Sequence, residues 1–304
     1  MKKLVAAIDI GGTNTKFGLV TEAGKIISED SVLTKNFSDP RELVKEVSDR
    51  IFKMLPAGSE LSGAGIGAPN GNFYTGTIDF APNLAWKGSI PLAKYFSEVL
   101  NCKALLTNDA KAAALGEMIF GGAKKMKDFL FITLGTGLGS GIVANGNLVY
   151  GHDSLAGEVG HVIMFQDGRQ CGCGRKGCLE TYCSATGLKR TYAELNPQAG
   201  TVDSKYIFDK ANAGDKVALE AFRRTGDVLG LALANSVAYT RPEAIFLFGG
   251  LVGSGDLIFK PTIESFERNL LNIYKNKIKI LPSQLPDNDA AILGAASLIL
   301  NDHN

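Results

Sequence analysis

The 304-residue sequence has no long hydrophobic run and almost no excess of charge of one sign. Its first apolar run, from Leu4 to Ile8, ends at Asp9, which is too early for the hydrophobic part of a secretory signal. No segment approaches the roughly 20 apolar residues of a membrane-spanning helix. The net charge of +1 indicates neither a polyanion nor an anionic membrane surface as a partner. These absences predict a soluble, cytoplasmic protein that binds neither nucleic acid nor membranes.

Cysteine is also scarce. The sequence contains five, and three of them cluster between residues 171 and 178. An odd number with such a cluster argues against a disulfide framework and fits a reducing compartment. Cys102 and Cys183 stand outside the cluster and are interpreted as packing residues.

Glycine, in contrast, is abundant, and two glycine-containing segments resemble each other. Gly12 to Val20 reads G-T-x-x-x-x-G-L-V, and Gly135 to Val143 reads G-T-x-x-x-x-G-I-V. Each follows an apolar strand and precedes a second glycine turn, which predicts two equivalent β-hairpins. Two unrelated hairpins are the alternative, but the matched spacing favours an internal duplication.

The remaining segments alternate between helix and strand. Asp39-Pro40 has the residues of a helix start, and strands are expected to end near residues 67, 107 and 248. Helices are expected at 110–119, 215–239 and 289–300. This order predicts an α/β fold with two similar halves. The 45% hydrophobic content suffices for two domains, expected at 1–120, joined by a closing helix at 289–304, and at 121–288.

The first glycine turn has the residues of a phosphate site. It consists of Asp9, Gly11, Gly12 and Thr13 at the end of a strand. Glycines let backbone N–H groups approach phosphate oxygens, and a carboxylate binds Mg²⁺ directly or through water. A bare hairpin turn is the alternative, but the second turn, with Thr136 and Gly137, repeats the motif. No G-K-[ST] follows, so neither turn is a Walker A loop.

Two further segments allow two interpretations each. Gly249-Gly250 follows a strand and would let an adenosine lie against bare backbone, or would serve only in helix packing. Asp109 is expected in the first turn of a helix, where the helix dipole would keep its carboxylate ionised for accepting a hydroxyl proton. Local sequence alone favours a capping residue at Asp109.

The strongest local motif is the cysteine cluster. Cys171, Cys173 and Cys178, with His161 ten residues before the first of them, form a Cys₃His set. Four protein ligands close a tetrahedral zinc site and leave no position for water, so the zinc would be structural. Free or redox-active thiols are the alternative. Glu158 and Glu180 stand beside these residues, and a zinc-tied loop would hold such polar groups rigidly for gripping sugar hydroxyls.

Together these motifs resemble the ROK sugar kinases, particularly their bacterial glucokinase branch. The resemblance covers nearly the whole chain. It rests on D-I-G-G-T, on N-D-A-x-A-A-A-L-G-E, on L-G-T-G-L-G-S-G-I, on E-V-G-H and on C-G-C-G-x-x-G-C-L-E, at residues 9–13, 108–117, 134–142, 158–161 and 171–180.

The resemblance implies an actin-like ATPase fold with two domains around a cleft. It implies that Asp109 is the base for the 6-hydroxyl of a hexose, with ATP and Mg²⁺ as cofactors and glucose as the favoured substrate. The residues expected to hold the sugar are Asn83, Asn108, Glu158, His161 and Glu180. A homodimer is expected by resemblance only.

Some members of the family are repressors with a preceding DNA-binding segment. The early position of Asp9 argues against one here. The fructokinases of the family have a second histidine in place of a zinc-loop cysteine, unlike this chain.

Two positions depart from the family pattern. Lys111 stands where asparagine is usual, and Asn70 where glycine is usual. Two alternatives to a glucokinase stay open, an N-acetylhexosamine kinase and a sugar sensor without catalysis. The sequence does not indicate whether polyphosphate replaces ATP.

Overall fold

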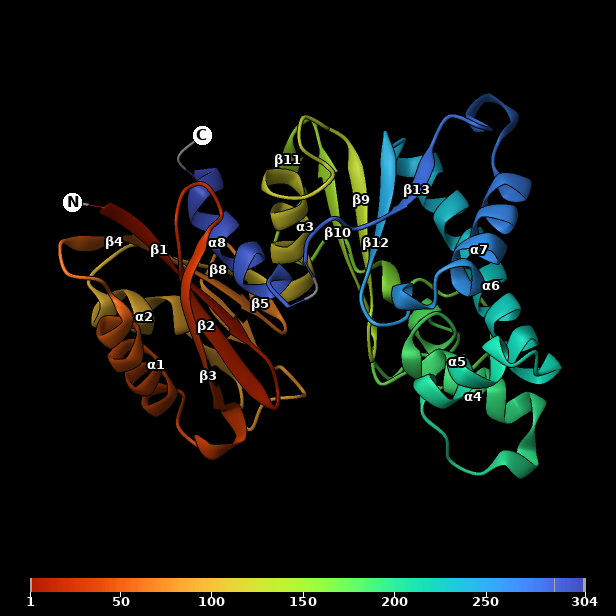
Figure 1. The fold of residues 1–304 in the computed structure, drawn as a ribbon, viewed down its shortest axis with the longest axis horizontal. Coiled ribbons are helices and arrows are strands. Elements are labelled where there is room, and N and C mark those ends of the chain that lie inside the picture. The colour runs from red at the N-terminus through yellow and green to blue at the C-terminus, as the bar shows by residue number, and fades with distance from the viewer. Residues whose placement is uncertain (1, 287, 303–304) are drawn as a thin grey trace. The chain divides into compact units, whose positions relative to one another are not determined.

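The computed structural model describes residues 2–286 and 288–302 and has a mixed α/β architecture (Figure 1). The chain forms two compact units. Unit 1 contains the described residues of Met1–Lys125, Leu148–Ala156 and Gln284–Asn304, and unit 2 contains Met126–Asn147 and Gly157–Ser283. The expected α/β class is confirmed.

Unit 1 is built on a five-stranded sheet in the order β3-β2-β1-β4-β8. The first three strands pair antiparallel as a meander, and β4 and β8 then run parallel to β1. The buried middle of β1 is apolar on both faces, as expected of a central strand covered on both sides. The strands are β1 (Lys2–Ile10), β2 (Asn14–Val20), β3 (Ile26–Leu33), β4 (Ser59–Ala68) and β8 (Ala104–Asn108).

The helices of unit 1 begin where the sequence places capping residues. Asp39 Oδ1 accepts a hydrogen bond from Arg41 N at 2.8 Å, and Pro40 occupies the first position of α1 (Pro40–Met54). The other helices are α2 (Leu92–Leu100), α3 (Asp109–Ile119) and α8 (Ala290–Asp302). A small antiparallel sheet completes the unit, with β5 (Gly71–Asn72), β6 (Thr77–Asp79) and β7 (Ser89–Ile90).

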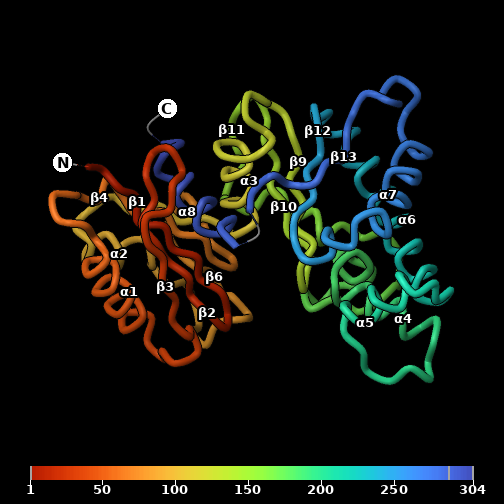
Figure 2. Tube along the Cα trace, in the orientation of Figure 1, coloured from red at the N-terminus to blue at the C-terminus, as the bar shows by residue number. Residues whose placement is uncertain are grey.

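Helix α8 brings the end of the chain back to its beginning. The trace beyond residue 284 lies among the N-terminal elements in both views (Figure 2), where α8 packs against α3, β1 and β4. The approach is close because glycines line it. A Cβ added at Gly65 of β4 would overlap the carbonyl oxygen of Ala295, and one at Gly294 would come within 2.9 Å of Ala112 backbone atoms.

Unit 2 repeats the sheet of unit 1. Its strand order is β11-β10-β9-β12-β13, with β9 and β10 antiparallel and with β12 and β13 parallel to β9. The duplication expected from the two glycine turns is therefore present in the strand order itself. The strands are β9 (Phe129–Leu134), β10 (Leu138–Ala144), β11 (Asn147–Leu148), β12 (Ala244–Phe248) and β13 (Lys279–Pro282).

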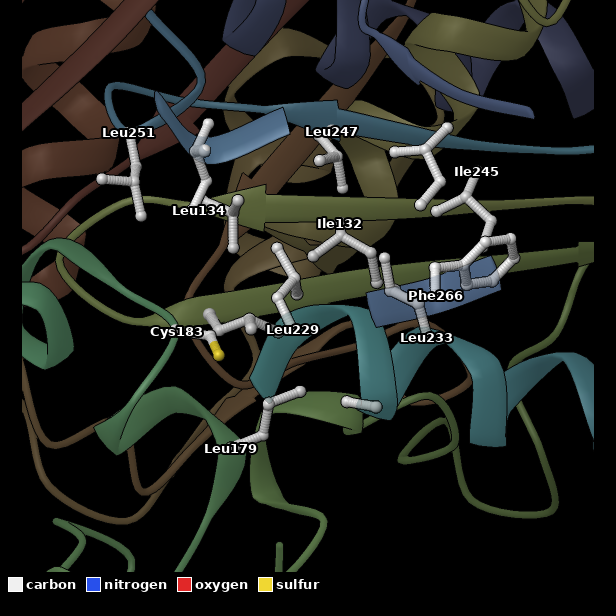
Figure 3. Close-up of a cluster of buried hydrophobic side chains, with 14 of the residues drawn as sticks. Ile132, Leu134, Leu179, Cys183, Leu229, Leu233, Ile245, Leu247, Leu251 and Phe266 are labelled. Carbon is white, nitrogen blue, oxygen red and sulfur yellow. The ribbon is translucent and has the colours of Figure 1, made fainter. Parts of the chain in front are cut away.

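Helices α6 and α7 lie side by side in unit 2 (Figure 1), and Gly226 and Gly230 of α6 allow the close approach to Pro261 and Thr262 of α7. Leu229 and Leu233 of α6 pack under the strands β9 and β12 (Figure 3). The helices are α4 (Ala185–Leu195), α5 (Ser204–Asn212), α6 (Lys216–Thr240) and α7 (Asp256–Asn269). Short 3₁₀ turns are η1 (Thr34–Asn36), η2 (Val159–His161), η3 (Leu179–Thr181), η4 (Pro197–Ala199), η5 (Val252–Ser254) and η6 (Asn272–Tyr274).

One segment was not expected from the sequence. Leu148–Ala156 leaves the second repeat and belongs to unit 1, after which the chain returns to unit 2 at Gly157. The sequence-based division at residue 120 assigned these residues to the other half. None of the described helices is both long enough and apolar enough to cross a lipid bilayer.

We expect Gly65→Ala to destabilise the protein by about 1–3 kcal/mol or more, because the new methyl group would force β4 and α8 apart. The measurement is the midpoint of urea unfolding. Gly253→Ala is the matched control, because an added Cβ at Gly253 has no atom within 4 Å. Equal stability of the two variants would contradict the tight packing of α8.

Candidate active site and metal centre

The carboxyl ends of three parallel strands place the polar residues of unit 1 at one edge of its sheet. In the β1–β4 pairing Asp9 faces Gly67, and in the β4–β8 pairing Ala68 faces Asn108. Asp109 follows directly as the first residue of α3. Functional side chains gather at this edge in α/β sheets.

Gly67 separates the two acidic residues. A Cβ built on it would lie 3.3 Å from Asp9 Oδ1 and 3.7 Å from the Cα of Asp109. Any side chain here would therefore crowd both aspartates. Sequence reasoning did not identify Gly67 as a site residue, although its place after Gly65-Ile66 at a strand end was available as a signal.

The cap of α3 is Asn108, not Asp109. Asn108 Oδ1 accepts hydrogen bonds from Ala110 N at 3.0 Å and Lys111 N at 3.4 Å. Asp109 Oδ1 accepts a bond from the same Ala110 N at 2.9 Å, and its side chain stays open to solvent. The capping interpretation of Asp109 is therefore the weaker one, because the neighbouring asparagine already does that work.

Crowding alters the protonation of both aspartates. Burial, with a smaller contribution from the Asp109 charge, raises the pKa of Asp9 to about 7, against the opposing effect of Lys16. The densely packed surroundings of Asp109 also raise its pKa, more than its hydrogen bonds from Ala110 and Asn108 lower it, although the side chain still reaches solvent. This effect of packing opposes the helix dipole, which was expected to keep Asp109 ionised. The loss of water around the carboxyl group raises its pKa by more than the helix dipole and the N–H donors lower it.

The first glycine turn lies beside a predicted sugar residue. Gly11 N donates a hydrogen bond to Asn14 O at 2.9 Å and so closes the turn between β1 and β2, with Thr13 exposed within it. A Cβ on Gly12 would come within 2.6 Å of the carbonyl oxygen of Asn83. Unit 1 thus brings Asp9, Asp109 and this turn to the same sheet edge, with Asn83 against the turn.

The structure accounts for both departures from the family pattern. Asn70 has a φ of +51°, in the left-handed region that glycine and asparagine tolerate best, and its Nδ2 donates to Asp79 O at 3.0 Å. Lys111 does not point into solvent. It is only 2% exposed, and its Nζ donates to Ser154 O at 2.6 Å.

The second glycine turn has the same position in unit 2. Gly135 N donates to Gly137 O at 3.0 Å in the connection from β9 to β10, and Thr136 is exposed. A Cβ on Gly137 would lie 2.8 Å from Glu180 Oε2. The carboxylate of Glu180 therefore lies against this turn, a contact that the sequence did not indicate.

The third glycine site borders a cavity of about 420 Å³ within unit 2. Gly249 has a φ of +106° and packs where β12 ends, with its Cβ position 2.8 Å from Leu134 O, so only glycine fits. Gly250 lines the cavity. The other lining residues include Thr136, Ser204, Lys205, Phe208 and Leu251. The residues from α5 were missed because no motif in the sequence marks them.

The Cys₃His set converges in space. The ligand atoms of His161, Cys171, Cys173 and Cys178 all lie within 4.8 Å of one another. Cys173 Sγ and Cys178 Sγ are 3.6 Å apart. Two sulfurs bound to one tetrahedral zinc at about 2.3 Å would lie roughly 3.8 Å apart, so the donor set and spacing fit this ion.

Glu180 also contacts this cluster. Cys171 Sγ lies 3.0 Å from Glu180 Oε1, and His161 Nδ1 lies 3.8 Å from the same oxygen. His161 Nδ1 also lies 3.8 Å from Cys171 Sγ, so this ring nitrogen faces the cluster. Glu158 immediately precedes η2 and is exposed. The cluster, Glu180 and the second glycine turn therefore form one connected region of unit 2.

Arg169 braces the same loop from the other side. Its guanidinium donates to Thr181 O at 2.7 Å and to both carboxylate oxygens of Glu194 at 2.8 and 2.6 Å, and it stacks 4.4 Å from the Tyr182 ring. Its backbone carbonyl accepts a bond from Gly177 N at 2.8 Å. The loop is therefore tied to α4 and η3 by protein contacts alone, independently of a metal.

Comparison with known proteins agrees with this geometry. A model of the ROK family matches residues 5–302. The glucokinase of Halalkalibacterium halodurans is 34% identical over 98% of this chain and 95% of its own length. The glucokinase of Thermotoga maritima is 33% identical over 98% of both chains.

A solved structure has the same fold throughout. It is a ROK family glucokinase from Streptomyces griseus in complex with glucose and AMPPNP, 32% identical, with a TM-score of 0.81 over 97% of this chain and 98% of that one. The family match, the relatives and the shared fold thus agree, and the chain belongs to the ROK family.

Proposed function

We propose that this protein phosphorylates the 6-hydroxyl of a hexose with ATP, and that its substrate is glucose. The observation that carries the proposal is the pair of aspartates, Asp9 and Asp109, beside a glycine turn at one sheet edge. A carboxylate base near a phosphate-binding turn is what transfer of a phosphoryl group to an alcohol needs. Two relatives that align with this chain over nearly their full length, from Halalkalibacterium halodurans and Thermotoga maritima, are glucokinases.

Asp109 acts as the base in this proposal. Its carboxylate orients the 6-hydroxyl and accepts its proton as the oxygen attacks the γ-phosphate. The Asn108 side chain supplies a hydrogen bond to Asp109, which favours the ionised form that a base requires. Asn83, whose backbone contacts Gly12, would bind sugar hydroxyls.

The nucleotide is assigned mainly to unit 2. The cavity of about 420 Å³ is of suitable size for a ligand such as adenosine, and Gly250 lets the base lie against bare backbone. Thr136 lines both this cavity and the second glycine turn, so a triphosphate leaving the cavity would meet the turn's N–H groups.

Magnesium fits the residues of unit 1. The carboxylate of Asp9, raised in pKa by burial and by Asp109, is a hard oxygen donor whose ionised form a cation would stabilise. When bound, the ion would supply charge neutralisation for the phosphates. Asp9 would hold it, directly or through water.

Zinc is proposed for the Cys₃His cluster, in a structural role. The Arg175 backbone N–H lowers the pKa of the Cys173 thiol to about 6, whereas burial raises the pKa of Cys171 and Cys178, so a bound cation would be needed to ionise those two thiols. Since Nδ1 of His161 faces the cluster, its other ring nitrogen stays available for a sugar hydroxyl. Glu158 and Glu180 complete the proposed sugar-binding set.

A homodimer and a cytoplasmic setting are also proposed. Tyr239 is 91% exposed beside an apolar hollow that includes Val162 and Met164. An exposed aromatic beside such a hollow is typical of a surface that another protein covers. The cluster of reduced thiols and the use of ATP fit the cytoplasm.

The direct test measures ADP release over a panel of glucose, other hexoses and N-acetylhexosamines, with wild type, Asp109→Asn and the surface control Asp49→Asn. We expect glucose to be the best acceptor. Asp109→Asn should lower kcat by roughly 10²–10⁴-fold while ATP still binds. Asp49→Asn should match wild type. Sugar binding without ADP release would identify a sensor, and a preference for N-acetylhexosamines would reject glucose.

The raised pKa values predict a pH dependence. Asp9 and Asp109 both act as carboxylates, so kcat/KM for glucose should fall as the pH decreases through about 7 at limiting Mg²⁺. Saturating Mg²⁺ stabilises the Asp9 carboxylate and should move this fall to lower pH. The measurement is initial rate against pH at two Mg²⁺ concentrations. A flat profile down to about pH 5.5 at limiting Mg²⁺ would exclude these assignments.

Metal analysis tests the zinc site. We expect one zinc per chain in wild type and in Cys102→Ala, whose cysteine lies outside the cluster, but none in Cys173→Ala. Loss of zinc should lower the unfolding temperature and raise the KM for glucose, because Glu180 and His161 lose a brace. A chain that binds no zinc, or that keeps it in Cys173→Ala, would refute the assignment.

A further inference from the structure

The segment Leu148–Ala156, here called the strap, is bound to unit 1 by several contacts. Phe73 N donates to Ser154 Oγ at 2.8 Å, and Tyr74 Oη donates to Gly151 O at 3.0 Å. The rings of Phe73 and Tyr150 stack with centroids 4.2 Å apart. The strap is thus fixed on the turn between β5 and β6, although the chain on either side of it belongs to unit 2.

Ser154 is the strained point of the strap. It has a φ of +70° and is fully buried. A non-glycine residue in the left-handed region is strained and persists only where its surroundings determine it. Two partners do so here, Phe73 N at its hydroxyl and Lys111 Nζ at its carbonyl.

Lys111 supplies the stronger of these two bonds. Its ammonium donates to Ser154 O at 2.6 Å from a side chain that is 2% exposed. A charged donor in a buried place makes a short and strong hydrogen bond. Lys111 lies in the first turn of α3, two residues after Asp109, so the bond joins the strap to the turn that carries the base.

We propose that Lys111 is a positioning residue for hexose binding, and this inference rests on the proposed function. Its ammonium holds Ser154 on the first turn of α3. The strap then continues through Gly157 to Glu158 and His161, the residues assigned to the sugar. Because the strap is held in place, the sugar-binding segment begins at a point whose position relative to Asp109 does not vary.

The role depends on the length of the lysine side chain. Asparagine, the usual residue in the family, is about 2–3 Å shorter and cannot reach Ser154 O without backbone movement. Lys111→Asn therefore breaks the bond while it keeps a polar side chain at this helix position. Lys53→Met, which removes an exposed lysine from α1 of the same unit, is the control.

The experiment compares Michaelis constants and amide hydrogen exchange. In Lys111→Asn we expect the KM for glucose to rise about tenfold, the loss expected for one charge-assisted hydrogen bond, while the KM for ATP stays within about twofold. Exchange at the strap should become faster, and Lys53→Met should match wild type in all three. A purely structural lysine would lower the unfolding temperature and leave the KM for glucose unchanged, which would overturn the proposal.

A second variant tests whether the bond from Phe73 N and the bond from Lys111 Nζ hold the strap together as one unit. Ser154→Ala removes the acceptor of Phe73 N and should also raise the KM for glucose and the exchange of the strap. The KM for glucose of the double variant, Lys111→Asn with Ser154→Ala, should be little higher than that of the single variant with the higher KM, because one substitution already releases the strap. Full additivity would show two unrelated contacts and would overturn the proposal.

Failure of the proposed function is distinguishable from failure of this inference. If wild type phosphorylates no sugar in the panel, the proposed function fails. Faster strap exchange in Lys111→Asn than in Lys53→Met would then still identify the Lys111 anchor, because exchange needs no substrate. If wild type is active and strap exchange is the same in both variants, Lys111 does not hold the strap and the inference fails alone.

Discussion

Two carboxylates brought close together by parallel strands impose the main constraint on this protein. Asp9 lies near the end of β1 and Asp109 follows β8, and Gly67 near the end of β4 borders both residues. Burial raises the pKa of both carboxyl groups, and the Asp109 charge raises that of Asp9 further, so the site favours a proton or a cation. The space around the two carboxyl groups has to stay open, and the groups have to be able to ionise. The small residues at the strand ends, the glycine turn and the separate cap at Asn108 meet this requirement.

In unit 2, the main requirement is to hold a loop without regular secondary structure in one conformation. The Cys₃His cluster and Arg169 grip the loop from opposite sides. Glu180 contacts both the cysteine cluster and the second glycine turn. A side chain supported in this way has few rotamers left, which reduces the entropy that a bound sugar would have to remove.

Much of this arrangement could be predicted from the sequence because it is encoded locally. The duplicated glycine turns specify both sheets, and the cysteine spacing specifies the cluster. Contacts between distant segments were not predictable. Lys111 contacts Ser154 only because the strap returns to unit 1. Lys205 lines the cavity of unit 2 from a helix that no sequence motif marks. The effect of packing on the pKa of Asp109 was not predictable either, because it depends on the whole packed unit.

The return of α8 to the N-terminal sheet has a consequence for synthesis. Residues 1–125 are translated well before α8, so the face of β1 and β4 against which α8 packs stays uncovered until α8 is made. Unit 2 is complete by Ser283, before α8 exists. Unit 1 therefore cannot complete its packing before α8 is made, whereas every residue of unit 2 precedes α8 in the sequence.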